Sequence, residues 1–136
     1  MPKPNTILPK PESDYRLFVD GSYKDGFIGC GVLVLPGYQE YCDGQPGQNS
    51  TQAEMQAVEL AITKVPDNSH CIIYTDLISL IELINQREFS EQHLRQIEAR
   101  YMSDQSPHHR RAHELASKGR EWAMNGRQKK KRPCQS

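Results

Sequence analysis

Residues 71–76, CIIYTD, form a short and nearly continuous apolar run, and this run most constrains the fold. Such a run is typical of a strand that is buried on both faces of a sheet. Residues 51–65 place small and apolar side chains three or four positions apart, which predicts a helix, and a second helix is expected at 77–86. A strand, a helix and a strand in succession imply parallel pairing between the strands at 38–44 and 71–76. The sequence therefore predicts an α/β domain.

Three strands of an antiparallel meander are expected before the first helix, at 15–20, 28–35 and 38–44. Gly21 and Ser22 permit a tight turn after the first strand. Either Ser50 or Thr51 can cap the helix that follows the third strand. These strands and the buried run at 71–76 would form one mixed sheet.

The C-terminal half is less clearly patterned. Residues 95–103 fit either a last strand or the continuation of a helix that starts near Ser90. A final amphipathic helix is predicted at 108–125, with apolar residues on one side. The chain would then end its folded part close to residue 125.

The length of 136 residues suits a single domain, which we place at 15–125. A Pro-rich arm at 1–14 and a basic tail at 126–136 are expected to be disordered. The net charge of zero hides a strong asymmetry. Residues 1–107 carry 8 Lys and Arg against 15 Asp and Glu, a charge of −7, whereas residues 108–136 carry 9 against 2, a charge of +7.

The basic C-terminal end suggests a polyanionic partner, with nucleic acid as the first candidate, although a solvated tail that aids solubility would have the same composition. No apolar run approaches the ~20 residues that cross a bilayer, so no membrane association is expected. The arm at 1–14 lacks the apolar core of a signal peptide. We expect a cytoplasmic monomer, or a nuclear one in a eukaryotic host, where the tail sequence KKKRP would suit a localisation signal.

Three acidic residues lie beside apolar segments that should pack in the core: Asp20 in YRLFVD, Glu54 in STQAEMQAVELAI and Asp76 in CIIYTD. Asp20 and Asp76 are expected at the ends of their strands, and Glu54 in the first turns of the helix between them. Carboxylates at the edge of a core lose solvation unless a positive charge meets them, and no Lys or Arg is adjacent in sequence. If the two strands are neighbours, the three side chains can converge on a site for Mg²⁺ or Mn²⁺. Such acids also serve as helix caps and dipole partners, which is the simpler interpretation of each residue alone.

The order of these motifs resembles the type 1 ribonuclease H family. The matching elements are DGS after the first strand, AEMQA at the start of the helix and YTD at the end of the buried strand, with RAHELASKG as a looser fourth match. The resemblance covers residues 15–85 well and 95–119 more loosely. It implies a ribonuclease H-like fold, with a five-stranded mixed sheet flanked by helices.

The resemblance also implies a function and a site. The activity would be endonucleolytic hydrolysis of the RNA strand of RNA–DNA hybrids by two Mg²⁺ or Mn²⁺ ions, leaving a 3′-hydroxyl and a 5′-phosphate. Asp20, Glu54 and Asp76 would be the catalytic and metal-binding carboxylates. Contacts to the 2′-hydroxyl groups of the hybrid would select the substrate. The residues nearest to make such contacts would be Gly21, Ser22, Ser50, Thr51 and Gln52.

The chain departs from the family pattern at several positions. The fourth carboxylate of the family falls on His113, whose imidazole could bind metal, with a preference for Mn²⁺, or move a proton, and could equally be an ordinary helix residue. Leu77 and Ile78 stand where the family usually has polar residues after the strand. The segment before the last helix leaves no room for the extra basic helix of some members. Basic residues after residue 108, among them Arg110 and Arg111, would then hold the substrate, with a steep dependence on salt.

The segment SDQSPHHRR carries a pair of histidines before the predicted last helix. In the family a histidine in this loop is thought to assist turnover, and His108 or His109 could take that part. A solvent-exposed loop pair is the alternative that the sequence favours. Two other functions also fit the sequence: a non-catalytic nucleic-acid-binding module on the same fold, and a related nuclease that acts on DNA.

Overall fold

The computed structural model describes residues 14–86, 96–103 and 105–126. The elements in chain order are β1 (Tyr15–Lys24), β2 (Phe27–Leu35), β3 (Gln39–Pro46), α2 (Ser50–Ile62), β4 (His70–Thr75), α3 (Ile78–Asn85), β5 (Gln96–Tyr101) and α4 (Pro107–Met124). The strands form one five-stranded mixed sheet in the order β3-β2-β1-β4-β5. The hairpin pairs β1–β2 and β2–β3 are antiparallel, whereas β4 is parallel to both β1 and β5. Within this described part of the chain, no helix is long and apolar enough to span a bilayer.

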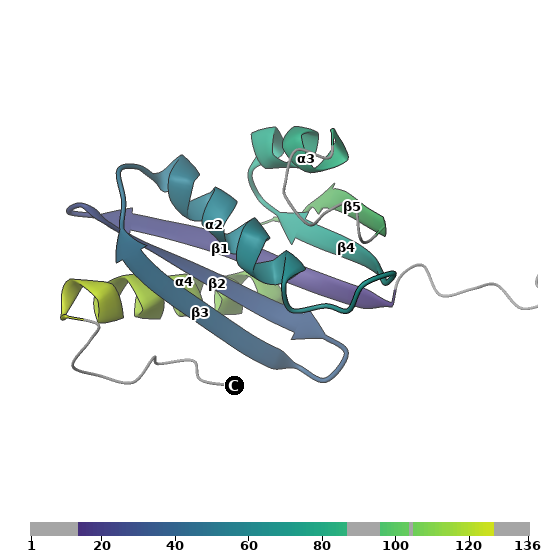
Figure 1. Ribbon diagram of the computed structural model, residues 1–136, viewed down its shortest axis with the longest axis horizontal. Coiled ribbons are helices and arrows are strands. Elements are labelled where there is room, and N and C mark those ends of the chain that lie inside the picture. The colour runs from purple at the N-terminus through teal and green to yellow at the C-terminus, as the bar shows by residue number, and fades with distance from the viewer. Residues whose placement is uncertain (1–13, 87–95, 104, 127–136) are drawn as a thin grey trace, which may run out of the picture.

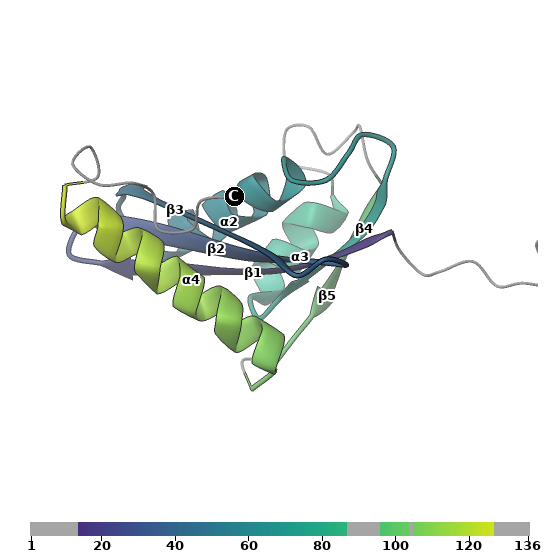
Figure 2. The same cartoon turned by 90° about the horizontal axis from the view of Figure 1, so that it is seen from below.

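Helices cover both faces of the sheet, as the continuous apolar run of β4 predicts. Figures 1 and 2 show α2 and α3 on one face and α4 on the other. The larger core lies under α2 and α3 and includes Leu17, Val19 and Ile73, which are fully buried. Phe18 points to the opposite face and packs with Leu33 and Ala112 beneath α4. The alternation along β1 therefore assigns successive side chains to opposite layers.

The N-terminal half of α4 lies very close to β2 because a glycine faces it. A Cβ atom at Gly31 would overlap the backbone carbonyl oxygen of Ala112. Only glycine allows the helix backbone to approach the sheet to this distance. The same half of α4 is tied to β3 by Arg111, whose guanidinium donates to both carboxylate oxygens of Glu40 at 2.6 and 2.8 Å. These contacts fix the position and rotation of α4 over the site described below.

The first strand is longer than the sequence predicts, and the turn expected at residues 21–22 is wrong. β1 runs on through Gly21 and Ser22 to Lys24. The turn instead uses Asp25 and Gly26, both with positive φ, at 53° and 85°. An Asp-Gly pair is a strong signal for a two-residue hairpin, since this turn needs positive φ at both central residues. Asp20 therefore lies inside β1 and not at its end.

Three further expectations need correction or can now be decided. The helix cap is Asn49, not Ser50 or Thr51, because the Asn49 side chain accepts a hydrogen bond from the Gln52 N–H at 2.8 Å. β4 pairs in parallel with β1 and not with β3, since the meander places β1 at the centre of the sheet. Residues 96–101 form a strand. The alternative helix start near Ser90, and nearly all of the arm at 1–14 and the tail at 126–136, lie outside the described residues.

Candidate active site

The parallel register between β1 and β4 brings Asp20 and Asp76 together. The last paired residues are Phe18 and Tyr74, and their rings stack with centroids 4.8 Å apart. Asp20 lies two positions later in β1 and Asp76 directly follows the last residue of β4, and His109 Nε2 lies within 3.9 Å of both carboxylates. Asp20 is almost fully buried, whereas the Asp76 side chain is 32% exposed. One carboxylate thus lies at the base of the site and the other at its opening.

Glu54 joins this pair because α2 lies directly against β1. A Cβ atom at Gly21 would be only 2.5 Å from the backbone carbon of Ala53 and the backbone nitrogen of Glu54. The glycine of the DGS sequence therefore permits the close approach of the helix that carries the third carboxylate. One carboxylate oxygen of Glu54, Oε1, is buried without a hydrogen-bond partner.

The Glu54 carboxyl group is held in its neutral form when no cation is present. Burial, together with the negative charge of Asp20, a hydrogen bond with Asp20 and the charge of Asp76, raises the pKa of Glu54 to about 9, against a smaller opposing effect of the Gly21 backbone N–H. Desolvation and like charge both disfavour the ionised form of a carboxyl group. The cluster is therefore short of positive charge, which is the condition that a bound divalent cation would relieve.

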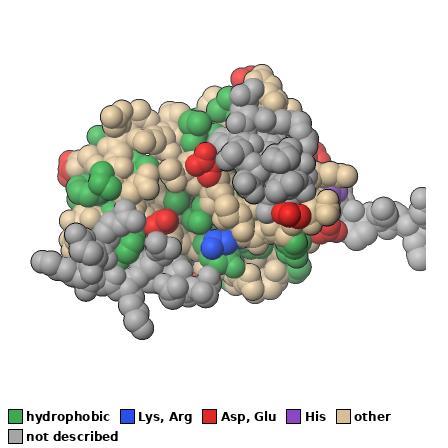
Figure 3. All heavy atoms as spheres, viewed as in Figure 1, with side chains coloured by type: hydrophobic (Ala, Val, Ile, Leu, Met, Phe, Trp, Pro, Cys, Tyr) green, Lys and Arg blue, Asp and Glu red, His purple; other side chains and the backbone are tan. Residues whose placement is uncertain are grey.

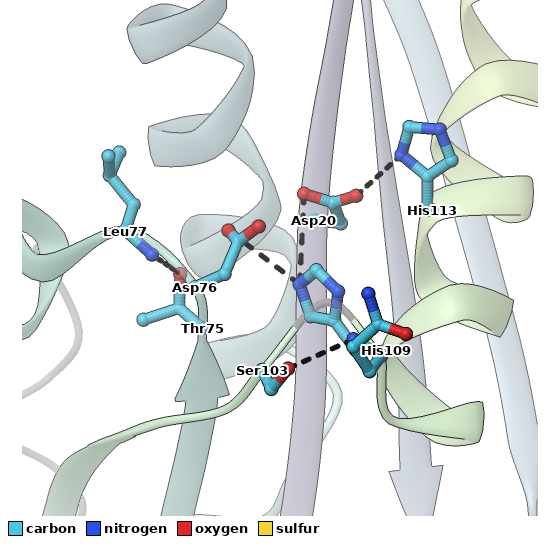
Figure 4. Close-up of polar contacts among 8 residues, drawn as sticks. Asp20, Thr75, Asp76, Leu77, Ser103, His109 and His113 are labelled. Carbon is cyan, nitrogen blue, oxygen red and sulfur yellow. Dashed lines mark hydrogen bonds and ion pairs between the residues drawn. The ribbon is translucent and has the colours of Figure 1, made fainter.

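Two histidines from one face of α4 complete the cluster (Figure 4). The Nδ1 atom of His113 forms a 2.8 Å hydrogen bond with Oδ2 of Asp20, and the His113 side chain is 62% exposed. The Nε2 atom of His109 lies 3.9 Å from Oδ1 of Asp20 and 3.7 Å from Oδ1 of Asp76. His109 is only 2% exposed, and its Nε2 has no hydrogen-bond partner. Ligand atoms of Asp20, Asp76 and His109 all lie within 4.8 Å of one another.

These residues surround an open pocket of about 370 Å³, lined by Asp20, Gly21, Glu54, Asp76, His109, Arg110 and His113. Its lining combines three acids, two imidazoles and one guanidinium group. The face of the molecule that α2 covers displays several acidic and few basic side chains (Figure 3). A cation is therefore the ligand that the pocket is best suited to hold, and Arg110 is placed to meet an anionic group bound beside it.

No protein-family profile and no curated protein matches this chain in sequence. Solved structures do match it. The LC11 ribonuclease H1 bound to an RNA/DNA hybrid has a TM-score of 0.65 and 16% identity over 82% of this chain and 99% of that chain. Ribonuclease H1 of Halobacterium salinarum has a TM-score of 0.63 and 14% identity over 80% and 98% of the two chains. The foamy viral protease-reverse transcriptase bound to double-stranded DNA has a TM-score of 0.57 and 14% identity over 80% and 94%.

The chain has the ribonuclease H fold. The five-stranded mixed sheet flanked by helices, which the motif order implies, is thereby confirmed. At 14–16% identity the likeness shows the fold and not the reaction, so the chemistry rests on the residues of this chain.

The structure places the predicted catalytic residues of this ribonuclease H fold in one pocket. Asp20, Glu54, Asp76 and His113 all line it. Their roles in catalysis and metal binding remain predictions. Among the described residues, the set whose potential ligand atoms lie within 4.8 Å of one another consists of Asp20, Asp76 and His109 and does not include His113.

The predicted substrate-binding residues are more dispersed. Gly21 and Arg110 line the pocket. Ser22 is buried, and its hydroxyl accepts a hydrogen bond from Arg120. Arg111 is engaged by Glu40 and Glu114, and these contacts raise its pKa. The remaining three residues, Ser50, Thr51 and Gln52, form the first turn of α2.

The sequence-based interpretation of His109 as part of an exposed loop pair is wrong. His109 belongs to the first turn of α4 and is buried beside the acids, whereas the ring of His108 packs on Phe18 at 4.7 Å. One signal was present in the sequence. His109 and His113 are four residues apart, which places them on one face of a helix that begins before residue 109.

Proposed function

We propose that this protein is a divalent-metal-dependent endonuclease that hydrolyses the RNA strand of RNA–DNA hybrids. One observation carries the proposal: Asp20 of β1, Glu54 of α2 and Asp76, which directly follows β4, converge in one open pocket. Asp20 and Asp76 are 56 positions apart in the sequence, and packing of the core does not require that three acidic side chains meet. Apolar side chains at these positions would cost less free energy to bury.

The residues present fit Mg²⁺ or Mn²⁺. Carboxylate oxygens are the ligands that both ions prefer. The buried Oε1 atom of Glu54 without a hydrogen-bond partner and the raised pKa of its carboxyl group mark a cluster whose negative charge a bound cation would balance. When bound, two such ions would supply an activated water and stabilise the leaving oxygen of a phosphodiester.

The chain's own groups hold and orient the site. His113 fixes one oxygen of Asp20 through its 2.8 Å hydrogen bond. The Gly21 N–H donates to Glu54 and favours its ionised form. Asp76, at the carboxyl end of β4, is the most exposed of the three acids and lies at the opening where substrate would enter. Arg110 on the rim is placed to contact a phosphate of the bound strand.

A structural neighbour that is bound to an RNA/DNA hybrid supports the hybrid as the substrate class. Discrimination would come from 2′-hydroxyl contacts by the Gly21 backbone and the exposed first turn of α2, which begins four residues before Glu54. Another neighbour is bound to double-stranded DNA, so DNA duplex is the proper competitor substrate.

The test is cleavage of end-labelled hybrid, DNA duplex and RNA duplex of one sequence, with Mg²⁺ and separately with Mn²⁺. We expect the hybrid to be cut in its RNA strand, leaving 5′-phosphate ends. Asp76→Asn should lower the rate on the order of 10³-fold while hybrid binding persists, because a ligand of the metal is lost but the fold is kept. Asp25→Asn, at the tip of the same hairpin that carries Asp20, is the matched control and should leave the rate unchanged, since Asn tolerates the positive φ at that position.

Three results would contradict the proposal. Unchanged cleavage in Asp76→Asn would show that the roles are assigned wrongly. Binding of the hybrid by the unaltered protein without any turnover would identify a non-catalytic nucleic-acid-binding module. Faster cleavage of the DNA duplex than of the hybrid would identify a DNA-directed nuclease.

A further inference from the structure

The two histidines of α4 contact the same carboxylate in different ways. His113 reaches Oδ2 of Asp20 with a hydrogen bond of normal length, through Nδ1. His109 faces the other oxygen, Oδ1, and also faces Asp76 (Figure 4). Asp20 therefore lies between the two imidazoles, and of these two rings it is that of His109 that also points toward Asp76.

The His109 ring does not have the contacts of an ordinary buried histidine. A core imidazole normally has its ring nitrogens hydrogen-bonded, because an unpaired buried polar atom is costly. Here Nε2 is buried without a partner, although two carboxylate oxygens lie 3.7 and 3.9 Å away. If attraction to these acids alone positioned the His109 ring, its Nε2 should approach a carboxylate oxygen to about the 2.8 Å that separates His113 Nδ1 from Asp20 Oδ2. The separation leaves room between Nε2 and both oxygens.

That room matches the size of a metal ion. Two ligands of one ion, each ~2.1 Å from it, can be at most ~4.2 Å apart. The distances from His109 Nε2 to Asp20 and Asp76 fall inside this limit. The ligand atoms of all three residues lie within 4.8 Å of one another, so a carboxylate shift of a few tenths of an ångström is enough for all three to reach one ion. The contacts of α4 with Gly31 and Glu40 hold the helix, and with it His109, over the two acids.

We propose that His109 is a direct ligand of the catalytic metal together with Asp20 and Asp76, and that His113 is a positioning residue that orients Asp20. This inference rests on the proposed function and refines its metal site. An imidazole nitrogen binds Mn²⁺ and later transition ions better than Mg²⁺, which prefers oxygen ligands. The pocket should therefore discriminate in favour of Mn²⁺, and His109 should be the source of that discrimination.

The experiment measures metal binding rather than activity. Mn²⁺ and Mg²⁺ are titrated calorimetrically into the full-length protein, His109→Asn, His113→Asn and the control His108→Gln, which removes the neighbouring imidazole that does not face the acids. His109→Asn should weaken Mn²⁺ binding about 100-fold but Mg²⁺ binding less than about 10-fold. His113→Asn should weaken both ions alike, by about 10-fold, as expected for a residue that acts through a ligand.

Pulsed electron paramagnetic resonance of bound Mn²⁺ gives a direct signature. The unaltered protein should show coupling to one histidine nitrogen, and labelling of histidine with ¹⁵N should change it. The coupling should persist in His113→Asn and His108→Gln and disappear in His109→Asn. Absence of nitrogen coupling in the unaltered protein would overturn the inference without relying on any variant, and so would its loss in His113→Asn with retention in His109→Asn.

These outcomes separate the inference from the proposed function. Hybrid cleavage in Mg²⁺ together with no nitrogen coupling to Mn²⁺ would refute the role of His109 and leave the nuclease assignment intact. Nitrogen coupling in a protein that cuts no nucleic acid would support the metal site and refute the nuclease assignment.

Discussion

Replacement of Glu54 by glutamine should stabilise the metal-free protein at neutral and alkaline pH. In the folded state the pKa of Glu54 is raised to about 9 by burial and by the charges of Asp20 and Asp76. In the unfolded chain an ordinary glutamate has a pKa of about 4.3. Between these two values the folded protein holds a proton that the unfolded protein has released. The free energy of unfolding must therefore fall as the pH rises through this window.

The size of the effect follows from the linkage relation. The slope is at most about 1.4 kcal/mol per pH unit, so three units above the unfolded pKa the full cost is about 4 kcal/mol. Water in the open pocket screens the carboxylates, so we expect about half of this cost. Near pH 7.5, Glu54→Gln should therefore raise the free energy of unfolding by about 2 kcal/mol. Glutamine has the shape of the neutral acid but cannot ionise. Its advantage over glutamate should therefore be small at pH 5 and grow with each unit of pH.

The assay is urea unfolding in the presence of a chelator at pH 5, 6, 7 and 8. The single tryptophan, Trp122, is buried on α4 and reports unfolding by fluorescence. Glu59→Gln, on the exposed side of the same helix, is the matched control and should follow the unaltered protein. Parallel pH profiles for the unaltered protein and Glu54→Gln would refute the reasoning. Saturating Mn²⁺ should make the unaltered protein more stable than Glu54→Gln. An ion that binds only the folded state raises the free energy of unfolding, and it does so more in the protein that keeps the Glu54 carboxylate as a ligand.

Two further changes test the packing of α4. Gly31→Ala should lower the free energy of unfolding by about 1–3 kcal/mol, because its methyl group overlaps the backbone of the helix, and unchanged urea midpoints would contradict this contact. A double-mutant cycle on Arg111 and Glu40 should give a coupling energy of about 1 kcal/mol in urea unfolding. Arg111→Ala should weaken hybrid binding less than Arg110→Ala in a filter-binding assay, since Arg111 is already paired within the protein; the reverse order would show that substrate displaces Glu40.

The sequence predicts the sheet and the helices well where one periodicity dominates. The run CIIYTD and the helix pattern after residue 50 leave little choice, because a strand buried on both faces and an amphipathic helix have different spacings. The end of β1 is predicted wrongly because two glycine-containing pairs compete for the turn. Gly21 serves close packing against α2, whereas Gly26 serves the turn. A glycine in a sequence does not reveal which of these two needs it meets.

The carboxylates are predictable for a related reason. Their positions beside apolar runs follow from local pattern even though the end of β1 does not, and a parallel pairing of β1 with β4 then places Asp20 and Asp76 side by side. The inward position of His109, in contrast, does not follow from the local sequence pattern alone. Whether a residue in the first turn of a helix faces the site or the solvent depends on the rotation of that helix over the sheet. The spacing of His109 and His113 shows that the two share a helix face. Which way that face turns is set by tertiary contacts, through Gly31 and the Arg111–Glu40 ion pair.

The match of His113 to a carboxylate position of the family illustrates a limit of motif transfer. A motif aligns positions along a helix, but a ligand is defined by the atom that reaches the ion. The imidazole of His113 is longer than a carboxylate side chain, and its Nδ1 is already hydrogen-bonded to Asp20. One turn earlier, Nε2 of His109 has no hydrogen-bond partner and faces Asp20 and Asp76. Under the ligand assignment that we propose, the substitution at the family's fourth carboxylate is offset one turn away on the same helix face. The i, i+4 pair would then supply both a ligand and the group that orients Asp20.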